Sequence, residues 1–246
     1  MNAWLDADWP APRGVRALTT IRHGLGSSLA PFDAFNLGLR CGDETVTVLE
    51  NRNQLATALA LPSAPRWLRQ VHCIDVAIEP GRDEPEADAS VTSMPGIVLA
   101  ILTADCLPVV FSAKDGSDIA AAHAGWRGLC AGVLETTVAA IRTPANNIIA
   151  WLGSCAGPQA YEVGQEVFDA FVSRDAGASQ AFVATRPGHW RVDLYALARK
   201  RLADAGIAAN SIHGGGLCTI SEPSRFFSHR RDQRSGRMAT LVWIES

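Results

Sequence analysis

The sequence predicts an α+β fold in which mixed β-sheets are flanked by helices. Short apolar segments typical of strands are interspersed with amphipathic helical segments, but not in strict strand–helix–strand order. The glycine-rich segments 23–28 and 213–219 lack the GxGxxG pattern of a dinucleotide-binding turn, and no GxxxxGK[ST] loop is present. We therefore expect a single-domain α/β sandwich over residues 1–246, not a doubly wound nucleotide-binding fold.

Helices are expected where apolar residues recur three or four positions apart between capping residues. The first covers 43–62, with Asp43 or Glu44 as N-cap and an apolar stripe at Leu49, Leu55 and Leu59. Segment 128–142 is predicted to be one helix that starts near Gly125. Two further helices are expected over 164–175 and 193–206. The last has Asp193 as its N-cap and Gly206 at its end.

Strands are expected where short apolar or alternating segments lie between turn residues. These segments are 66–79, 96–102, 108–113, 118–124, 147–154 and 237–245. The most apolar stretch is interrupted by Asp105 and Pro108, so it is too short and too broken to span a bilayer. We interpret it as a pair of buried strands.

Composition and charge exclude several classes of function. The net charge of −3 attracts no polyanion, so we expect no nucleic-acid partner. The first residues resemble neither a signal peptide nor a transit peptide, so we expect a cytoplasmic protein without membrane contact. Its six cysteines stand singly, at 41, 73, 106, 130, 155 and 218. Without a CxxC pair, a zinc ribbon or thioredoxin motif is not indicated. Without a secretion signal, a disulfide framework is not expected.

Three potential metal ligands follow apolar segments: His72, Cys106 and His123. Side chains at strand ends project into the space above a sheet, where sites are usually built. Two imidazoles and one thiolate would form an open zinc site that leaves a fourth position free. A water molecule in that position can have a pKa of about 7. Copper is possible with the same ligands.

The same residues allow other interpretations. His72 could be a hydrogen-bonded strand histidine, Cys106 a core residue, and His123 a helix cap. In a metal-free enzyme, Cys106 would be the nucleophile, His123 its base and His72 an orienting group. Asp105 would support a histidine, act as a general base, or only form the turn before Pro108. A non-catalytic binding module fits least, because such groups are costly to bury without a role.

Several arginines and amides are candidates for substrate binding. The C-terminal segment 225–237 clusters arginines with Phe226 and Phe227, which would suit a phosphate and a stacked base, or form a solvated loop. We expect small-molecule binding at polar residues near the ligands and in this segment. The candidates for substrate and phosphate binding are Arg22, Asn36, Arg40, Gln70, Arg230 and Arg231.

Seven segments in order carry a family resemblance: "FNLGLRCGDE", "RQVH", "EADASVT", "LTADCLPVVF", "AAAHAGWRG", "GPQAYEVG" and "RFFSHRRDQRSGRMATLVWI". Together they resemble the laccase-domain or multicopper polyphenol oxidase family, also described as purine nucleoside phosphorylases and peptidoglycan editing factors. The resemblance runs from about Thr19 to the C-terminus. It implies an α/β sandwich and a zinc or copper site at His72, Cys106 and His123. Cys155, Ala156 and His229 depart from the usual pattern, which bears on substrate fit and not on the ligands.

The family names imply different activities. A full laccase needs a separate oxygen-reducing copper cluster with many imidazoles, and this chain has six histidines. The resemblance implies phosphorolysis of adenosine, inosine, guanosine and S-methyl-5′-thioadenosine, together with adenosine deamination. In deamination, a metal-activated water would attack purine C6 while Asp105 moves protons. The alternatives are a copper-dependent polyphenol oxidase and a thiol hydrolase acting on peptidoglycan precursors. The protein would be a monomer or a small homo-oligomer.

Overall fold

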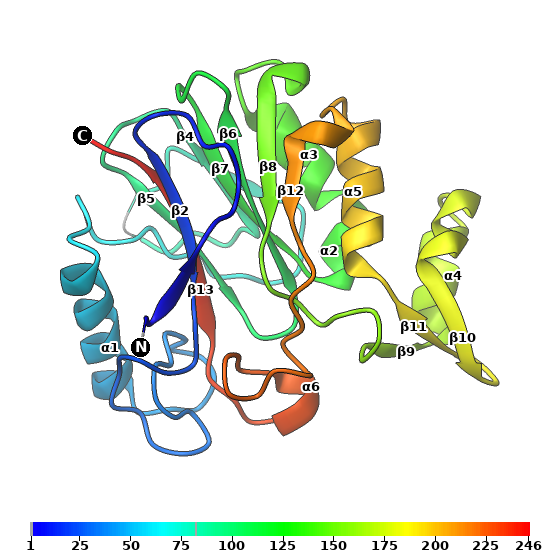
Figure 1. Ribbon diagram of the computed structural model, residues 1–246, viewed down its shortest axis with the longest axis horizontal. Coiled ribbons are helices and arrows are strands. Elements are labelled where there is room, and N and C mark those ends of the chain that lie inside the picture. Colours follow the sequence, from blue (N-terminus) through cyan, green and yellow to red (C-terminus); the bar gives the residue numbers. More distant parts are fainter. Residues whose placement is uncertain (1, 82) are drawn as a thin grey trace.

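Two β-sheets pack face to face at the centre of the computed structural model, which describes residues 2–81 and 83–246 (Figure 1). One sheet has four antiparallel strands in the order β1-β2-β13-β5. Their bounds are β1 Trp4–Asp6, β2 Val15–Thr20, β13 Met238–Ile244 and β5 Val98–Thr103. The C-terminal strand β13 lies between β2 and β5, so the two ends of the chain are joined in one sheet.

The second sheet is mixed and has the order β12-β8-β6-β7-β4-β3. The outer pairs β12/β8 and β3/β4 are parallel, and the inner pairs are antiparallel. The strands are β12 Ile212–Gly214, β8 Ile148–Leu152, β6 Leu107–Ala113, β7 Ile119–Ala124, β4 Ala89–Thr92 and β3 Val76–Ile78. A third, small sheet, β10-β11-β9, is formed by β10 Phe182–Arg186, β11 His189–Val192 and β9 Glu162–Gly164.

The outer faces of this double sheet are covered by α1 Thr45–Ala58, α2 Trp126–Ala131, α3 Val133–Ala140 and α5 Leu194–Asp204 (Figure 1). The other helices are α4 Gln165–Val172 and the short α6 His229–Asp232, and 3-10 turns lie at Ala145–Asn147, Ala176–Ala181 and Ala209–Ser211. α4 and the small sheet project from the main body at the right of Figure 1. In the part of the chain that the structure describes, the helices are too short or too polar to cross a bilayer.

The alternation of side chains along the strands explains the layers. In β6, Val109 and Phe111 pack against α2, α3 and α5. Val110 points to the opposite face and packs with Ile101 of the four-stranded sheet. On the other side of the molecule, Leu55 of α1 packs on the outer face of that sheet. Strands buried on both faces are apolar at nearly every position, which is why their sequences lack polar alternation. The predicted α+β fold class is confirmed.

Three predicted elements differ from the structure. Of the strand predicted over 66–79, only β3 forms. The side chain of Gln70 bonds to the backbone of Leu102 in place of a strand, donating to its O and accepting from its N–H, each at 2.8 Å. The helix predicted over 128–142 is broken at Gly132, whose φ of 111° is readily adopted only by glycine. In α1, Leu49 is exposed, and Asn51 takes its place on the buried face.

Candidate metal centre

His72, Cys106 and His123 converge on one point, as the sequence predicts. Their ligand atoms lie within 4.8 Å of one another, and Nε2 of His72 is 3.8 Å from Sγ of Cys106. The two imidazole rings lie edge to face with their centres 4.9 Å apart. Cys106 is the last residue of the turn between β5 and β6, and His123 is on β7. His72 lies in the loop before β3, where its φ of 63° is left-handed, and not at a strand end as expected.

Asp88, which comes directly before β4, holds two of these segments in place. Its Oδ1 lies 2.6 Å from Nδ1 of His123, and both side chains are buried. Its Oδ2 accepts hydrogen bonds from the backbone N–H groups of Val71 and Cys73, each at 2.9 Å. Because the Asp88 carboxylate accepts at Nδ1, Nε2 of His123 is the nitrogen left to bind an ion. One carboxylate therefore orients His123 and also anchors both residues that flank His72.

Gly125 lets the backbone approach the ligands closely. A Cβ atom at this position would lie 2.8 Å from Cδ2 of His72 and 3.0 Å from Sγ of Cys106. Real Cβ atoms essentially never make contacts under 3.0 Å. The glycine that starts α2 is therefore required by the space around the ligands, since its φ of −61° is open to any residue.

The charges of the ligands depend on one another. Burial alone would raise the pKa of the Cys106 thiol, but the His123 and His72 imidazoles outweigh it and lower this pKa to about 6. Burial would lower the pKa of His123, but the Cys106 sulfur and the Asp88 carboxylate raise it to about 9. Burial opposes ionisation of Asp88 as well, yet His123 and the N–H groups of Cys73 and Val71 hold its pKa far below the usual range. Cys106 is thus disposed to be a thiolate near neutral pH.

These residues fit a zinc ion. Zinc prefers nitrogen and sulfur ligands, and its bond lengths in a tetrahedral site separate two ligand atoms by about 3.6 Å. The 3.8 Å between Cys106 and His72 is close to that separation. The hydrogen bond from His123 to Asp88 is the carboxylate support that metal-bound histidines usually have. Three protein ligands are the number found in catalytic zinc sites.

The three ligands lie at the wall of a cavity of about 340 Å³. Of the residues predicted to bind substrate, Arg40 and Gln70 also line it. The Arg40 side chain is exposed and pairs with Glu84 at 2.8 Å. Gln70 is held by Leu102, so its side chain fixes the cavity wall and the loop that leads to His72.

Asn36 shapes the cavity without lining it. Its buried amide donates to Asp43 at 2.9 Å and accepts from the N–H groups of Gly38 and Arg237 at 2.9 and 2.8 Å. These bonds fix the loop from Gly38 to Cys41, which forms one wall of the cavity.

The other predicted residues also lie outside this lining. Arg22 donates to the backbone and carboxylate oxygens of Asp33 at 2.7 and 2.9 Å. Arg231 donates to the carbonyl groups of Thr219, Ile220 and Phe226. Both guanidinium groups therefore stabilise loops. A role for Arg22 or Arg231 in phosphate binding remains a prediction.

Asp105 is buried and held by two hydrogen bonds. It accepts from the hydroxyl of Thr219 and from the backbone N–H of Arg230, both at 2.6 Å. Its carboxylate therefore fixes the start of α6, and the carboxylate that supports a ligand histidine is that of Asp88. Phe226 and Phe227 are fully buried against Met238, so the expectation that they stack on a base is wrong.

Sequence reasoning missed Asp88, and it did not show that His229 and Arg237 face the cavity. Asp88 lies in the segment "EADASVT", directly before β4, whereas the ligand candidates follow apolar segments, so the signal that indicates the ligands does not indicate Asp88. His229 and Arg237 line the cavity from the C-terminal segment. The neighbouring Arg230 and Arg231 are predicted to bind substrate or phosphate, but the spacing does not show which basic side chains of the segment face the cavity.

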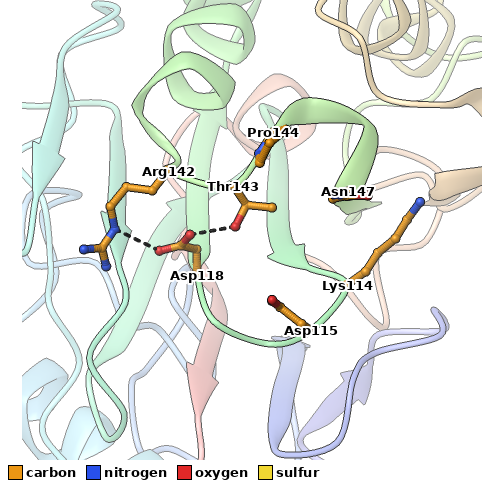
Figure 2. A pocket seen from close by; sticks show the side chains of 7 residues that line it. All are labelled: Lys114, Asp115, Asp118, Arg142, Thr143, Pro144 and Asn147. Atoms are coloured by element: carbon orange, nitrogen blue, oxygen red, sulfur yellow. Dashed lines mark hydrogen bonds and ion pairs between the residues drawn. The ribbon is translucent and has the colours of Figure 1, made fainter.

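A larger hollow of about 580 Å³ lies at the other end of β6 and β7 (Figure 2). Asp118 accepts hydrogen bonds there from Thr143 at 2.7 Å and Arg142 at 3.4 Å (Figure 2). No histidine or cysteine is among its lining residues. This hollow therefore lacks the nucleophiles and ligands of the 340 Å³ cavity, which is the better candidate for chemistry.

A double-sheet α/β fold with a two-histidine, one-cysteine ligand group in a cavity defines a class of candidate metalloproteins. The chain belongs to the family described as multi-copper polyphenol oxidoreductase laccase, whose profile matches residues 16–245. The resemblance predicted from the sequence motifs is confirmed.

Relatives in this family carry another name. A protein of Xylella fastidiosa strain Temecula1, called purine nucleoside phosphorylase, is 62% identical over 98% of this chain and 96% of the relative. The Escherichia coli K12 protein called purine nucleoside phosphorylase YfiH is 49% identical over 99% of this chain and 100% of the relative.

Solved structures share the fold. A Neisseria meningitidis protein, NMB0706 of the DUF152 family, has a TM-score of 0.94 and 42% identity, covering 100% of both chains. YlmD of Geobacillus stearothermophilus has a TM-score of 0.91 and 30% identity, covering 100% of this chain and 97% of the other.

Proposed function

We propose that this protein is a zinc-dependent purine nucleoside phosphorylase. The observation that carries this proposal is the convergence of His72, Cys106 and His123 beside a cavity, in a chain whose relatives bear that name. The substrates would be adenosine, inosine, guanosine and S-methyl-5′-thioadenosine, which are cleaved by phosphate to the base and a sugar 1-phosphate. We also keep the expectations of one domain over 1–246 and of a cytoplasmic location.

The chain's own residues divide the work in this proposal. His72, Cys106 and His123 would hold zinc, which supplies a Lewis acid when it is bound. Arg40, Arg237 and His229 provide polar groups at the cavity wall for the hydroxyls and ring nitrogens of a nucleoside. The cavity of about 340 Å³ is in the range of small-molecule sites.

Deamination of adenosine is the second activity that we propose for the same site. It requires a group that moves a proton near purine C6. The sequence makes Asp105 a candidate for this group, but both of its carboxylate oxygens already accept hydrogen bonds. His229, which is exposed at the cavity wall, is an additional candidate for this proton transfer.

A thiol hydrolase is a second candidate function, because one observation favours it. Sγ of Cys106 lies 3.8 Å from Nε2 of His72, and the lowered pKa of this thiol, about 6, with the raised pKa of His123, about 9, favours the ion pair of a cysteine nucleophile. The polyphenol oxidase fits less well. Among residues 2–81 and 83–246, one group of three metal-ligating side chains was found, and an oxygen-reducing copper cluster needs further imidazoles.

Metal analysis and product analysis together test this proposal. Protein purified without added metal is analysed by mass spectrometry of the metals, and about one zinc per chain is expected for an occupied three-ligand site. Wild type and Cys106→Ala are then incubated with adenosine, with and without phosphate. We expect adenine only with phosphate, inosine from deamination, and hypoxanthine where phosphate then cleaves that inosine. Cys106→Ala should form none of these products.

Each alternative has its own outcome. Metal-free protein that is alkylated rapidly at Cys106 and forms no nucleoside products would support the hydrolase. Several copper ions per chain with oxidation of phenols would support the oxidase. Wild-type protein that forms neither adenine, hypoxanthine nor inosine would disprove the proposed function.

A further inference from the structure

A second cavity of about 350 Å³ lies where three segments of the family resemblance meet. The segment "AAAHAGWRG" contributes Trp126 and Arg127, "GPQAYEVG" contributes Tyr161 and Glu162, and the C-terminal segment contributes Arg230. In the proposed function, these segments contribute the ligand His123 and the wall residues His229 and Arg237, whereas the residues that line the second cavity have no role. The second cavity therefore gathers sequence features that remain unexplained.

This cavity shares its walls with the metal centre. Gly125 lies beside His72 and Cys106, which a Cβ atom at this position would meet, and the next two residues, Trp126 and Arg127, line the second cavity. At the other wall, His229 lines the first cavity and Arg230 lines the second. The backbone N–H of Arg230 also donates to Asp105, the neighbour of Cys106. The two cavities thus adjoin at the same short segments.

The charged groups of the second cavity leave two guanidinium groups with free donors. Arg186 is neutralised, because its Nε and Nη2 both donate to the Glu162 carboxylate. Arg230 uses one N–H group on the Glu162 carbonyl and lies over the Tyr161 ring at 4.8 Å. Arg127 is exposed and lies 4.5 Å from the Trp126 ring, and no carboxylate of the described residues pairs with it.

The remaining polar groups of the lining are Glu166, His189 and Tyr161. Glu166 adds one negative charge, and its carboxylate folds back over Gly164. His189 is fixed by a contact of Nδ1 with the Pro187 carbonyl at 3.0 Å. Burial raises the pKa of Tyr161 to about 12, so its hydroxyl stays a neutral donor. Arg127, Arg230 and Tyr161 together offer donors to an oxyanion.

We propose that the second cavity binds inorganic phosphate, the co-substrate of phosphorolysis, through Arg127 and Arg230. Planar guanidinium groups match the oxygens of a phosphate dianion. This inference rests on the proposed function. A phosphate oxygen forms the bond to C1′ of the sugar, the C1′–N9 electron pair leaves with the purine, and the proton of monohydrogen phosphate ends on the base. The two cavities would hold the two reactants of this exchange.

The test measures phosphate binding and phosphorolysis separately. Inorganic phosphate is titrated into the whole protein by calorimetry, and KM values for phosphate and inosine are measured. Arg127→Met and Arg230→Met should each raise the phosphate Kd and KM by roughly 10- to 100-fold, because each removes charge-assisted hydrogen bonds. The inosine KM should stay unchanged. Arg191→Met is the matched control, since Arg191 is an exposed arginine of β11 outside the lining.

The outcomes separate this inference from the proposed function. Phosphate binding that depends on Arg127, without phosphorolysis, keeps the anion site and rejects the phosphorylase. Phosphorolysis with an unchanged phosphate KM in both variants rejects the anion site and keeps the phosphorylase. Adenosine monophosphate is titrated in parallel. If it binds through Arg127 while inorganic phosphate does not, the cavity takes a phosphate ester and our assignment is overturned.

Discussion

Oδ1 of Asp88 lies 2.6 Å from Nδ1 of His123, and both side chains are buried. The same carboxylate accepts from the N–H groups on both sides of His72. Two of the three candidate ligands are thus positioned through one residue that lies in none of the ligand segments. The orientation of the ligands depends on a buried hydrogen-bond network as much as on the fold.

Asp88→Asn should weaken zinc binding without unfolding the protein. An amide can neither hold the negative charge opposite His123 nor accept as strongly from the two backbone N–H groups. We expect zinc affinity to fall roughly 10- to 100-fold, as for other lost carboxylate partners of metal-bound histidines. Competition with a chelating dye measures this affinity. Asp75→Asn, at an exposed site nearby, is the control, and equal affinities in the two variants would contradict the assigned role.

Gly125→Ala should displace the ligands while leaving the sheets intact. The added methyl group would meet His72 and Cys106, and the exposed His72 loop is the part that can move. We expect zinc affinity to fall by about tenfold or more, on the scale of other disturbed metal sites. Circular dichroism and the unfolding temperature of the metal-free protein should stay close to wild type. Unchanged zinc affinity would show that the ligands lie farther from Gly125 than the structure places them.

In metal-free protein, Cys106 should be the most reactive of the thiols near the site. Its pKa of about 6 predicts that alkylation by iodoacetamide rises through pH 6, because the thiolate is the nucleophile. Cys73 is an internal control, since burial raises its pKa to about 11. Peptide mass spectrometry at each pH separates the two. An alkylation midpoint near pH 9 for Cys106 would contradict the described imidazole contacts.

Glu79 should make stability depend on pH. Burial opposes its ionisation, but hydrogen bonds from Thr92 and Ser93 outweigh this and lower its pKa below the ordinary value of 4.5. Its contribution is therefore fully present above pH 4.5 and is lost as the pH falls through the lowered pKa. Glu79→Gln should cost about 1 kcal/mol at pH 7, since the group is largely exposed.

Urea unfolding at several pH values measures this contribution. The difference between wild type and Glu79→Gln should shrink below pH 4.5, whereas Glu44→Gln, an exposed change without side-chain partners, should show no difference at any pH. A difference that grows toward low pH would have the opposite sign and would refute the argument.

Sequence patterns predicted the parts of this molecule that depend on local information. The apolar runs of β5, β6, β7 and β13 identified the buried strands, and the ends of two of them identified Cys106 and His123. Asp193 caps α5 as expected, accepting from the Ala196 N–H at 3.0 Å. These features are local because a cap or a strand is defined by neighbouring residues.

The rest depends on contacts between distant residues. The side chain of Gln70 bonds to the backbone of Leu102, where a neighbouring strand would otherwise pair. The alternation of apolar and polar residues over 66–79 does not reveal this bond. In the sequence, Arg22 and Arg231 are candidates for phosphate binding. In the structure, Arg22 donates to Asp33, and Arg231 donates to three backbone carbonyl groups. The role of Asp88 likewise depends on its contact with His123, which lies 35 positions away in the sequence.

His72 differs from the other two ligands in what carries it. Cys106 and His123 belong to hydrogen-bonded strands or their turn, whereas His72 stands on an exposed loop with a left-handed backbone. When a chelator removes the ion, Cys106 and His123 should therefore keep their positions, and only the loop that carries His72 should move away. The ion would then enter and leave as this loop closes and opens, and the rate at which the metal-free protein binds the ion again would report the motion of the His72 loop.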